Sequence, residues 1–217
     1  MAPAVNSPKA PRTRRTRRSE QAERTRRRIL DAATALFTDP GYAATTIEAI
    51  ATRADVAVET VYSRFRNKPN LLVAILEPAI VGTDDDVALF DLPDIDEIRA
   101  CTDQRRQLGL LAHLSRTILQ RTAQVHRILH AAASVDENAA ELQRTDAERR
   151  YQGQADYIEM LLANAPLRDG VTRANAADTY ATLASPATYA FLVEERAWTP
   201  EQFEHWLGDV LSRTLLP

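Results

Sequence analysis

The sequence is poor in the residues that mark several large classes of protein. Its 217 residues contain one cysteine, Cys101, so no internal disulfide can form and a reduced, cytoplasmic setting is expected. No apolar run reaches the roughly 18 residues that a membrane-spanning helix needs. The first residues also lack the apolar stretch of a secretory signal. Neither membrane insertion nor export is predicted.

Sequence motifs that carry catalysis are missing as well. The chain has no glycine-rich phosphate loop, no Gly-x-Ser-x-Gly turn, no His-Glu-x-x-His and no Cys-x-x-Cys. His126 and His130 are spaced to share a helical face, but no third ligand accompanies them, so no metal site is assigned. The sequence predicts a protein that is not an enzyme and that needs no cofactor.

Glycine is scarce, whereas alanine, leucine, arginine and glutamate are abundant, which favours helices. The 45% apolar content is ordinary for a globular protein, and the length allows one large or two small domains. Charge is distributed unevenly. Ten basic residues and two glutamates give residues 1–28 a net charge of +8, which leaves −11 for the remainder. This asymmetry indicates a polyanionic partner at one end of the chain.

Residues 45–72 have the layout of a helix-turn-helix. The first helix has an apolar face formed by Ile47, Ile50, Ala51 and Ala54. The pattern breaks at Asp55 and resumes at Val61 and Phe65. Asp55 occupies a corner position that often holds glycine, and aspartate tolerates the left-handed backbone expected there better than most residues do. Such a motif inserts the start of its second helix into a DNA major groove.

One segment resembles the recognition segment of the TetR family of bacterial transcription regulators. That segment reads Ala54-Asp55-Val56-Ala57-Val58-Glu59-Thr60-Val61-Tyr62-Ser63-Arg64-Phe65-Arg66-Asn67-Lys68. Residues 29–37 and 41–46 resemble the family's first helix and the lead-in to its second, so the resemblance extends over about residues 24–76. It implies an all-α fold of about nine to ten helices, with an N-terminal three-helix helix-turn-helix domain and a larger C-terminal helical domain for ligand binding and dimerisation.

The expected organisation has three parts. Residues 1–19 form a disordered basic arm, residues 20–82 the helix-turn-helix domain with a linking helix, and residues 83–217 the effector-binding and dimerisation domain. The arm either tracks DNA phosphates or is a solubilising tail. Pro78 is expected to kink or end the linking helix near residue 76 or 77. A break is expected near Thr122 in the first long helix of the second domain.

The candidate DNA-binding residues are Arg27, Thr45, Thr46, Val58, Glu59, Thr60, Tyr62, Ser63, Arg64 and Lys68. Val58 and Thr60 suit base edges, and Glu59 either accepts from cytosine or is a surface residue that stabilises the helix dipole. The family resemblance implies phosphate contacts for Tyr62 and Lys68. The alternative for Tyr62 is a ring in the core.

Two further sets of candidates lie in the second domain. Polar or adaptable residues among aliphatic neighbours suit a ligand pocket: His113, Thr117, Arg121, Tyr157, Met160 and Tyr180, with His126 and His130 beside them. The last helix has an apolar stripe that either contacts a second subunit or belongs to the core: Phe203, Trp206, Leu207, Val210 and Leu211.

The predicted function is that of a ligand-responsive regulator of transcription. A homodimer is expected to bind a palindromic DNA operator with two reading helices about 34 Å apart. The most favoured form is a repressor released by an unidentified small-molecule effector, although an activator fits the same residues. The alternative is an architectural or protein-partnered DNA-binding factor without an effector.

Overall fold

The computed structural model describes residues 17–82, 89 and 93–217, with side chains from Glu20 onward. Within these ranges the chain is all-helical and contains no strand. Its helices are α1 (Arg17–Leu36), α2 (Ile47–Arg53), α3 (Val58–Phe65), α4 (Lys68–Val81), α5 (Pro93–Ala100), α6 (Gln104–Ala133), α7 (Glu137–Leu162), α8 (Arg173–Leu183), α9 (Pro186–Tyr189) and α10 (Pro200–Leu215). The predicted all-α class is confirmed.

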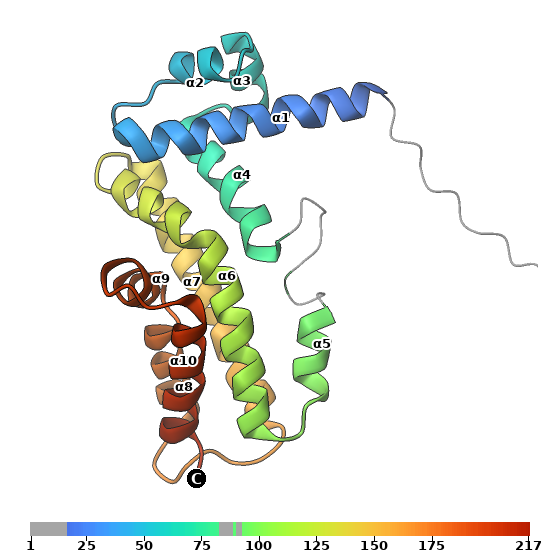
Figure 1. Cartoon of the computed structure of the whole chain (residues 1–217), viewed down its shortest axis with the longest axis vertical. Helices are drawn as coiled ribbons and strands as arrows, with labels where there is room; N and C mark the ends of the chain where they lie inside the picture. Colours follow the sequence, from blue (N-terminus) through green and yellow to red (C-terminus); the bar gives the residue numbers. More distant parts are fainter. Residues whose placement is uncertain (1–16, 83–88, 90–92) are drawn as a thin grey trace, which may run out of the picture.

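The helices fall into two groups along the molecule (Figure 1). Helices α1, α2 and α3 gather at one end, and α4 leads from them to the long helices α6 and α7. Helix α10 packs along α6, and α8 packs along α7, so these four form the body of the structure. No helix in the described part of the chain combines the length and the apolar character needed to cross a bilayer.

Two clusters of buried apolar side chains stabilise these groups. One lies among α5 to α10, and the other holds α1 to α4 together. The second cluster also includes Ile128, Leu129 and Ala132 of α6 and Ala139 of α7. The end of the α6–α7 pair is therefore part of the same core as the helix-turn-helix.

Most helix starts carry a residue whose side chain caps the helix. The side chains of Thr46, Asn67, Thr172, Ser185 and Thr199 each accept a hydrogen bond from a backbone N–H in the first turn of the following helix. These bonds satisfy amides that have no partner inside the helix. Local chemistry fixes these boundaries, which explains why the sequence alone locates them.

Three helix boundaries differ from those expected from the sequence. Helix α1 begins at Arg17, so residues 17–19 belong to a helix, while the remainder of the expected basic arm lies outside the described residues. Helix α4 continues through Pro78 to Val81 and ends at Gly82, whose φ of 77° is left-handed. Helix α6 is unbroken at Thr122, because that residue is buried and its hydroxyl donates to the Ile118 carbonyl within the helix.

Candidate functional site

The corner between α2 and α3 has the geometry that the sequence predicts. Asp55 has a φ of 53°, so the left-handed backbone expected for this residue is confirmed. Arg28 of α1 supports the corner, since its Nη2 donates to the Asp55 carbonyl at 3.3 Å and its Nη1 to the carboxylate at 3.5 Å. Ile50, Ala51 and Val61 are almost fully buried beneath the corner. The corner is therefore held by packing between α2 and α3 and by the contact of Arg28 with Asp55.

Helix α3 presents one face to solvent. Val61 and Phe65 are buried in the core, whereas the Tyr62 side chain is 47% exposed, so its interpretation as a core ring is wrong. Four candidate residues of α3 are exposed: Glu59, Tyr62, Ser63 and Arg64. Val58 and Thr60 are half-buried at the start of the helix. Acidic, hydroxyl, phenolic and guanidinium groups thus share an unobstructed helical surface.

The adjacent threonines that precede α2 have different roles. The Thr46 side chain caps α2 by accepting from the Ala49 N–H at 3.1 Å, and the residue is exposed. Thr45 is buried, and its hydroxyl lies 2.8 Å from both the Leu36 and Gly41 carbonyls. A DNA contact by the Thr45 side chain is therefore wrong. The sequence could not separate the two, because either threonine suits a cap.

Lys68 lies inside a junction between the helix-turn-helix and the body. Its Nζ donates to the carbonyls of Tyr42 and Thr45 at 2.8 and 3.0 Å and lies 4.2 Å from the centroid of the Tyr42 ring. Burial lowers the pKa of Lys68, and the charge of Asp136 opposes this effect. An ammonium group has three donors, and these two carbonyls use two of them. Arg27, by contrast, is exposed on α1.

Tyr42 extends the same junction to α7. Its hydroxyl donates to Asp136 Oδ2 at 2.8 Å, and Asp136 is the N-cap residue of α7. The ring is buried and lies 5.0 Å from the Phe37 ring. Burial raises the pKa of the Tyr42 hydroxyl, as do the hydrogen bond to Asp136 and its charge. The group of helices α1 to α3, called the reading head below, is thereby joined to the helical body by a buried polar contact.

A cavity of about 280 Å³ lies between α4, α6 and α7. Its walls are mainly aliphatic, with Val73, Leu76 and Ile80 of α4 facing side chains of the two long helices. Of the residues predicted for a pocket, Tyr157 and His126 line it. Volume and lining are those of a small-molecule site.

A polar group sits on the α6–α7 side of this cavity. Asp146 accepts from Arg150 Nε at 2.9 Å, and its Oδ2 lies 3.5 Å from His126 Nδ1. Burial lowers the pKa of His126 to about 4, and the Arg150 charge adds to this effect while Asp146 opposes it. The other histidine of the pair, His130, is exposed and contacts Gln143 at 3.0 Å. Within the described residues, no three His, Cys, Asp or Glu side chains are grouped to hold a metal.

The other predicted pocket residues do not reach the cavity. Tyr180 is fully buried between α6 and α8, with its hydroxyl 2.8 Å from Ser115 Oγ. Arg121 donates to the Ile80 carbonyl at 2.8 Å, and Met160 packs against the core of the body. The Thr117 hydroxyl is buried without a hydrogen-bond partner. The sequence shows that these residues alternate with aliphatic ones, but it does not show which side of α6 each one faces.

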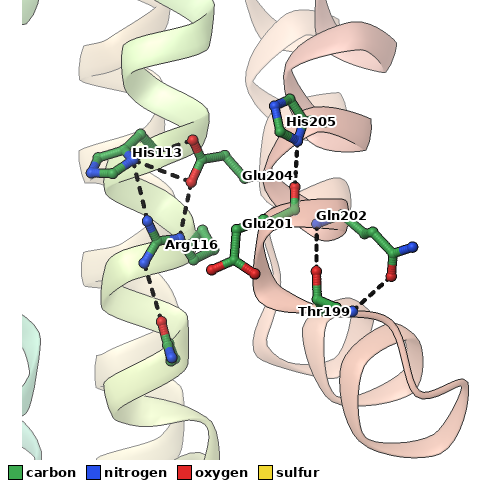
Figure 2. Close-up of polar contacts among 8 residues, drawn as sticks. His113, Arg116, Thr199, Glu201, Gln202, Glu204 and His205 are labelled. Atoms are coloured by element: carbon green, nitrogen blue, oxygen red, sulfur yellow. Dashed lines mark hydrogen bonds and ion pairs between the residues drawn. The ribbon is translucent and has the colours of Figure 1, made fainter.

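His113 is also remote from the cavity, on the side of α6 that faces α10. Figure 2 shows His113 and Arg116 of α6 directed toward Glu204 of α10. His113 Nδ1 lies 3.2 Å from both carboxylate oxygens, and Arg116 Nε donates to one of them at 2.9 Å. His113 therefore joins α6 to α10, and its assignment to a ligand pocket is wrong.

The apolar stripe of α10 is mostly core. Phe203, Leu207 and Leu211 have no exposed surface, so their assignment to a dimer interface is wrong. Trp206 and Val210 are only half-buried, and the rings of Trp206 and Trp198 lie 6.0 Å apart. Trp206 and Val210 are the two predicted positions of this stripe that retain surface for a second subunit.

The structure is that of a helix-turn-helix protein. Helices α2 and α3 form the motif, and a helical body with a cavity follows it. Residues 29–75 match the sequence profile of the bacterial regulatory proteins of the tetR family. The chain is 53% identical over 51 residues to the HTH-type transcriptional repressor KstR of Rhodococcus jostii (strain RHA1). That match covers 24% of each protein, so this chain matches about a quarter of the length of the relative.

Solved structures show the same fold over nearly the whole chain. NalD, the secondary repressor of the MexAB-OprM multidrug efflux pump in Pseudomonas aeruginosa, is 25% identical with a TM-score of 0.67, and the match covers 91% of this chain and 98% of that one. The SmeT–triclosan complex is 22% identical with a TM-score of 0.66, over 89% and 92%. Residues 29–75 are therefore similar to the DNA-binding segment of the tetR family, and the whole chain shares its fold with these regulators.

Proposed function

We propose that this protein is a cytoplasmic repressor that binds a palindromic DNA operator as a homodimer and releases it when a small-molecule effector binds. The observation that carries the DNA-binding part is the exposed face of α3, held on a buried corner in a segment similar to that of the repressor KstR. Residues 20–82 are proposed as the DNA-binding domain, and residues 83–217 as the effector-binding and dimerisation domain.

The proposed DNA contacts follow from the position of each side chain on α3. Val58, Glu59 and Thr60, at its first turn, are proposed to meet base edges. Tyr62, Ser63 and Arg64 are proposed to contact the backbone, together with Thr46 and with Arg27 of α1. Basic and hydroxyl groups around a reading helix are typical of phosphate binding, which fixes the register of the protein on DNA.

A dimer is proposed because α3 is short and one reading helix specifies few base pairs. Two copies related by a two-fold axis read half-sites one helical turn apart, about 34 Å. Trp206 and Val210 of α10 are the residues proposed to contact the second subunit.

The cavity favours an effector-responsive regulator over an effector-independent DNA-binding factor. It lies on α4, the helix that connects the reading head to the body, and its walls are mainly aliphatic. The similar protein SmeT forms a complex with triclosan, which supports a small-molecule ligand for this protein as well. The effector is proposed to act by its difference in affinity for the DNA-bound and released conformations.

Genomic footprinting with the purified protein, followed by fluorescence anisotropy on the recovered sites, tests this proposal. Arg64→Ala is expected to weaken binding to all sequences and to reduce the dependence on salt, whereas Thr60→Val is expected to change sequence preference. Arg106→Ala, at an exposed position near the start of α6 and far from α3, is the control and is expected to bind normally. A wild-type protein that ignores double-stranded DNA at low ionic strength would overturn the proposal, and one that stays monomeric on its operator would overturn the homodimer.

A further inference from the structure

We infer that the cavity accepts an uncharged, mostly apolar molecule whose hydroxyl group donates a hydrogen bond to His126. This inference rests on the effector role proposed for the cavity and adds the chemical class of the ligand. It follows from three properties of the walls: their apolar surface, their balance of charge and the hydrogen-bonding groups that they present.

Aliphatic side chains dominate the walls. Helix α4 contributes Val73, Leu76 and Ile80, and residues from α6 and α7 complete the surface, including Ile118, Leu119 and Leu142. Apolar surface of this kind favours a hydrocarbon or aromatic body, because burial of that body releases the water around it. A cavity of about 280 Å³ accommodates a molecule of drug-like size.

The charged groups of the cavity balance one another. Glu77 and Asp146 provide two carboxylates, and Arg149 and Arg150 provide two guanidinium groups. Asp146 is 8% exposed and is already paired with Arg150 Nε at 2.9 Å. Glu77 and Arg149 are exposed, so water screens their charges, and the buried part of the cavity offers only the Asp146–Arg150 pair. A carboxylate ligand beside this pair meets Asp146, and an ammonium ligand meets Arg150, so neither gains an unpaired opposite charge there. A buried charge without a partner is costly, and this selects against both.

His126 presents a hydrogen-bond acceptor. The Asp146 carboxylate, whose Oδ2 lies 3.5 Å from Nδ1, favours the neutral tautomer that carries its ring proton on Nδ1. Burial keeps the pKa of His126 low, so the ring is neutral at physiological pH. The remaining nitrogen, Nε2, then carries a lone pair, and no hydrogen-bond partner for it is present among the described residues. Since the side chain lines the cavity, a ligand O–H is the complementary group.

Gln154 supports the same choice of ligand. Its Nε2 points to the Ala184 carbonyl at 3.5 Å, which leaves Oε1 as a second acceptor on the cavity wall. Gln154 is 8% exposed, so this amide has little access to bulk water. Two acceptors within an apolar enclosure favour a ligand that brings a donor and disfavour one that brings only an acceptor.

Isothermal titration calorimetry of the full-length protein at neutral pH tests the inference with matched probes. The probes are 4-hexylphenol, its methyl ether 4-hexylanisole, 4-hexylbenzoate and 4-hexylbenzylamine. The phenol is expected to bind about 10-fold more tightly than the ether, as for one buried hydrogen bond, and more tightly than either charged probe. Equal affinity for phenol and ether, tighter binding of a charged probe, or no binding of the phenol would each overturn the inference.

A variant assigns the discrimination to His126. His126→Phe keeps a ring of similar size and removes the acceptor, so the preference for phenol over ether is expected to fall to about 2-fold or less. His130→Phe, on the exposed side of the same helix, is the control and is expected to keep the wild-type preference. If His126→Phe retains the full preference, His126 is not the acceptor; if it does not fold, the wild-type probe series still decides the ligand class. DNA binding is measured separately, so failure of the regulator proposal and failure of this inference are distinguishable.

Discussion

The bond between Tyr42 and Asp136 joins the reading head to the body, and its contribution to stability can be measured directly. The Tyr42 hydroxyl donates to Asp136 Oδ2 at 2.8 Å, while Asp136 Oδ1 accepts from the backbone N–H groups of Asn138 and Ala139 at 3.0 and 3.3 Å. Tyr42→Phe removes the first contact only. The cost is expected to be about 1–2 kcal/mol, because the acceptor is charged but only half-buried.

Asp136→Ala removes both the junction and the cap of α7. Loss of an N-cap costs about 1 kcal/mol, and loss of the Tyr42 contact adds its own cost, so about 2–3 kcal/mol is expected in total. In the double variant the contact can be lost only once. The measured cost is therefore expected to fall short of the sum of the single costs by about 1–2 kcal/mol.

Urea unfolding followed by circular dichroism gives the four free energies of this cycle. The protein concentration is held fixed, because the unfolding of any oligomer depends on concentration. Tyr62→Phe provides the matched control, since the same hydroxyl is removed from a side chain that is 47% exposed, and it is expected to change stability by less than about 0.5 kcal/mol. A coupling below about 0.5 kcal/mol between Tyr42→Phe and Asp136→Ala would refute the reasoning, because independent sites add within that margin.

Three further predictions concern backbone strain, an unpaired hydroxyl and protonation. Ala197 has a φ of 57°, so Ala197→Gly is expected to raise the thermal midpoint by relieving about 0.5 kcal/mol of net strain, whereas Ala174→Gly within α8 is expected to lower it. The Thr117 hydroxyl is buried without a partner, so Thr117→Val is expected to stabilise the protein by about 1 kcal/mol in urea unfolding; Thr122→Val, which loses a bond to Ile118, is expected to destabilise it. Burial lowers the folded pKa of His126 from 6.5 to about 4, so the unfolded chain takes up the proton first and stability is lost as pH falls through this window, by up to about 3 kcal/mol. A His126→Gln variant with the same pH dependence as wild type would contradict the last of these predictions.

Sequence reasoning located the helix-turn-helix because its determinants are local. The spacing of Ile50 and Ala51, the left-handed position at Asp55 and the caps at Thr46 and Asn67 act within a few residues of one another. Each is visible without knowledge of the tertiary fold. The same holds for the caps Thr172, Ser185 and Thr199, which lie at the starts of α8, α9 and α10.

Whether the apolar stripe of α10 is buried depends instead on α6, which is distant in the sequence. A Cβ placed on Gly208 would lie 3.6 Å from Ala112 Cβ and 3.9 Å from Gly109 Cα, so α10 approaches α6 closely through small residues. This approach covers Phe203 and Leu207 within the subunit. An apolar stripe at helical spacing shows that a face is covered, but it does not reveal whether another helix of the same chain or a second chain covers it.

The polar wall of the cavity was missed for a related reason. Asp146 and Arg150 lie on the polar first half of α7 and read as an exposed pair four residues apart, yet Asp146 is 8% exposed and pairs with a buried histidine of α6. Only the packing of α7 on α6 brings these groups together. An acidic residue i and a basic residue i+4 on an otherwise polar helix give no signal that separates a surface pair from a cavity wall.

Helix α4 contributes side chains both to the cavity wall and to the core of the reading head. Leu71 and Leu72, in its first half, are buried in the core that holds the helix-turn-helix, while Leu76 and Ile80, in its second half, line the cavity. Arg121 of α6 donates a hydrogen bond to the Ile80 carbonyl.

A ligand that pushes α4 away from α6 must therefore strain this hydrogen bond or turn α4 about it. Either movement displaces Leu71 and Leu72 relative to the ends of α6 and α7. Because those ends are part of the same core, and Tyr42 and Asp136 fasten it further, the head cannot absorb the displacement by sliding freely. It is expected to change its orientation, which is the quantity that sets the spacing of two reading helices in a dimer.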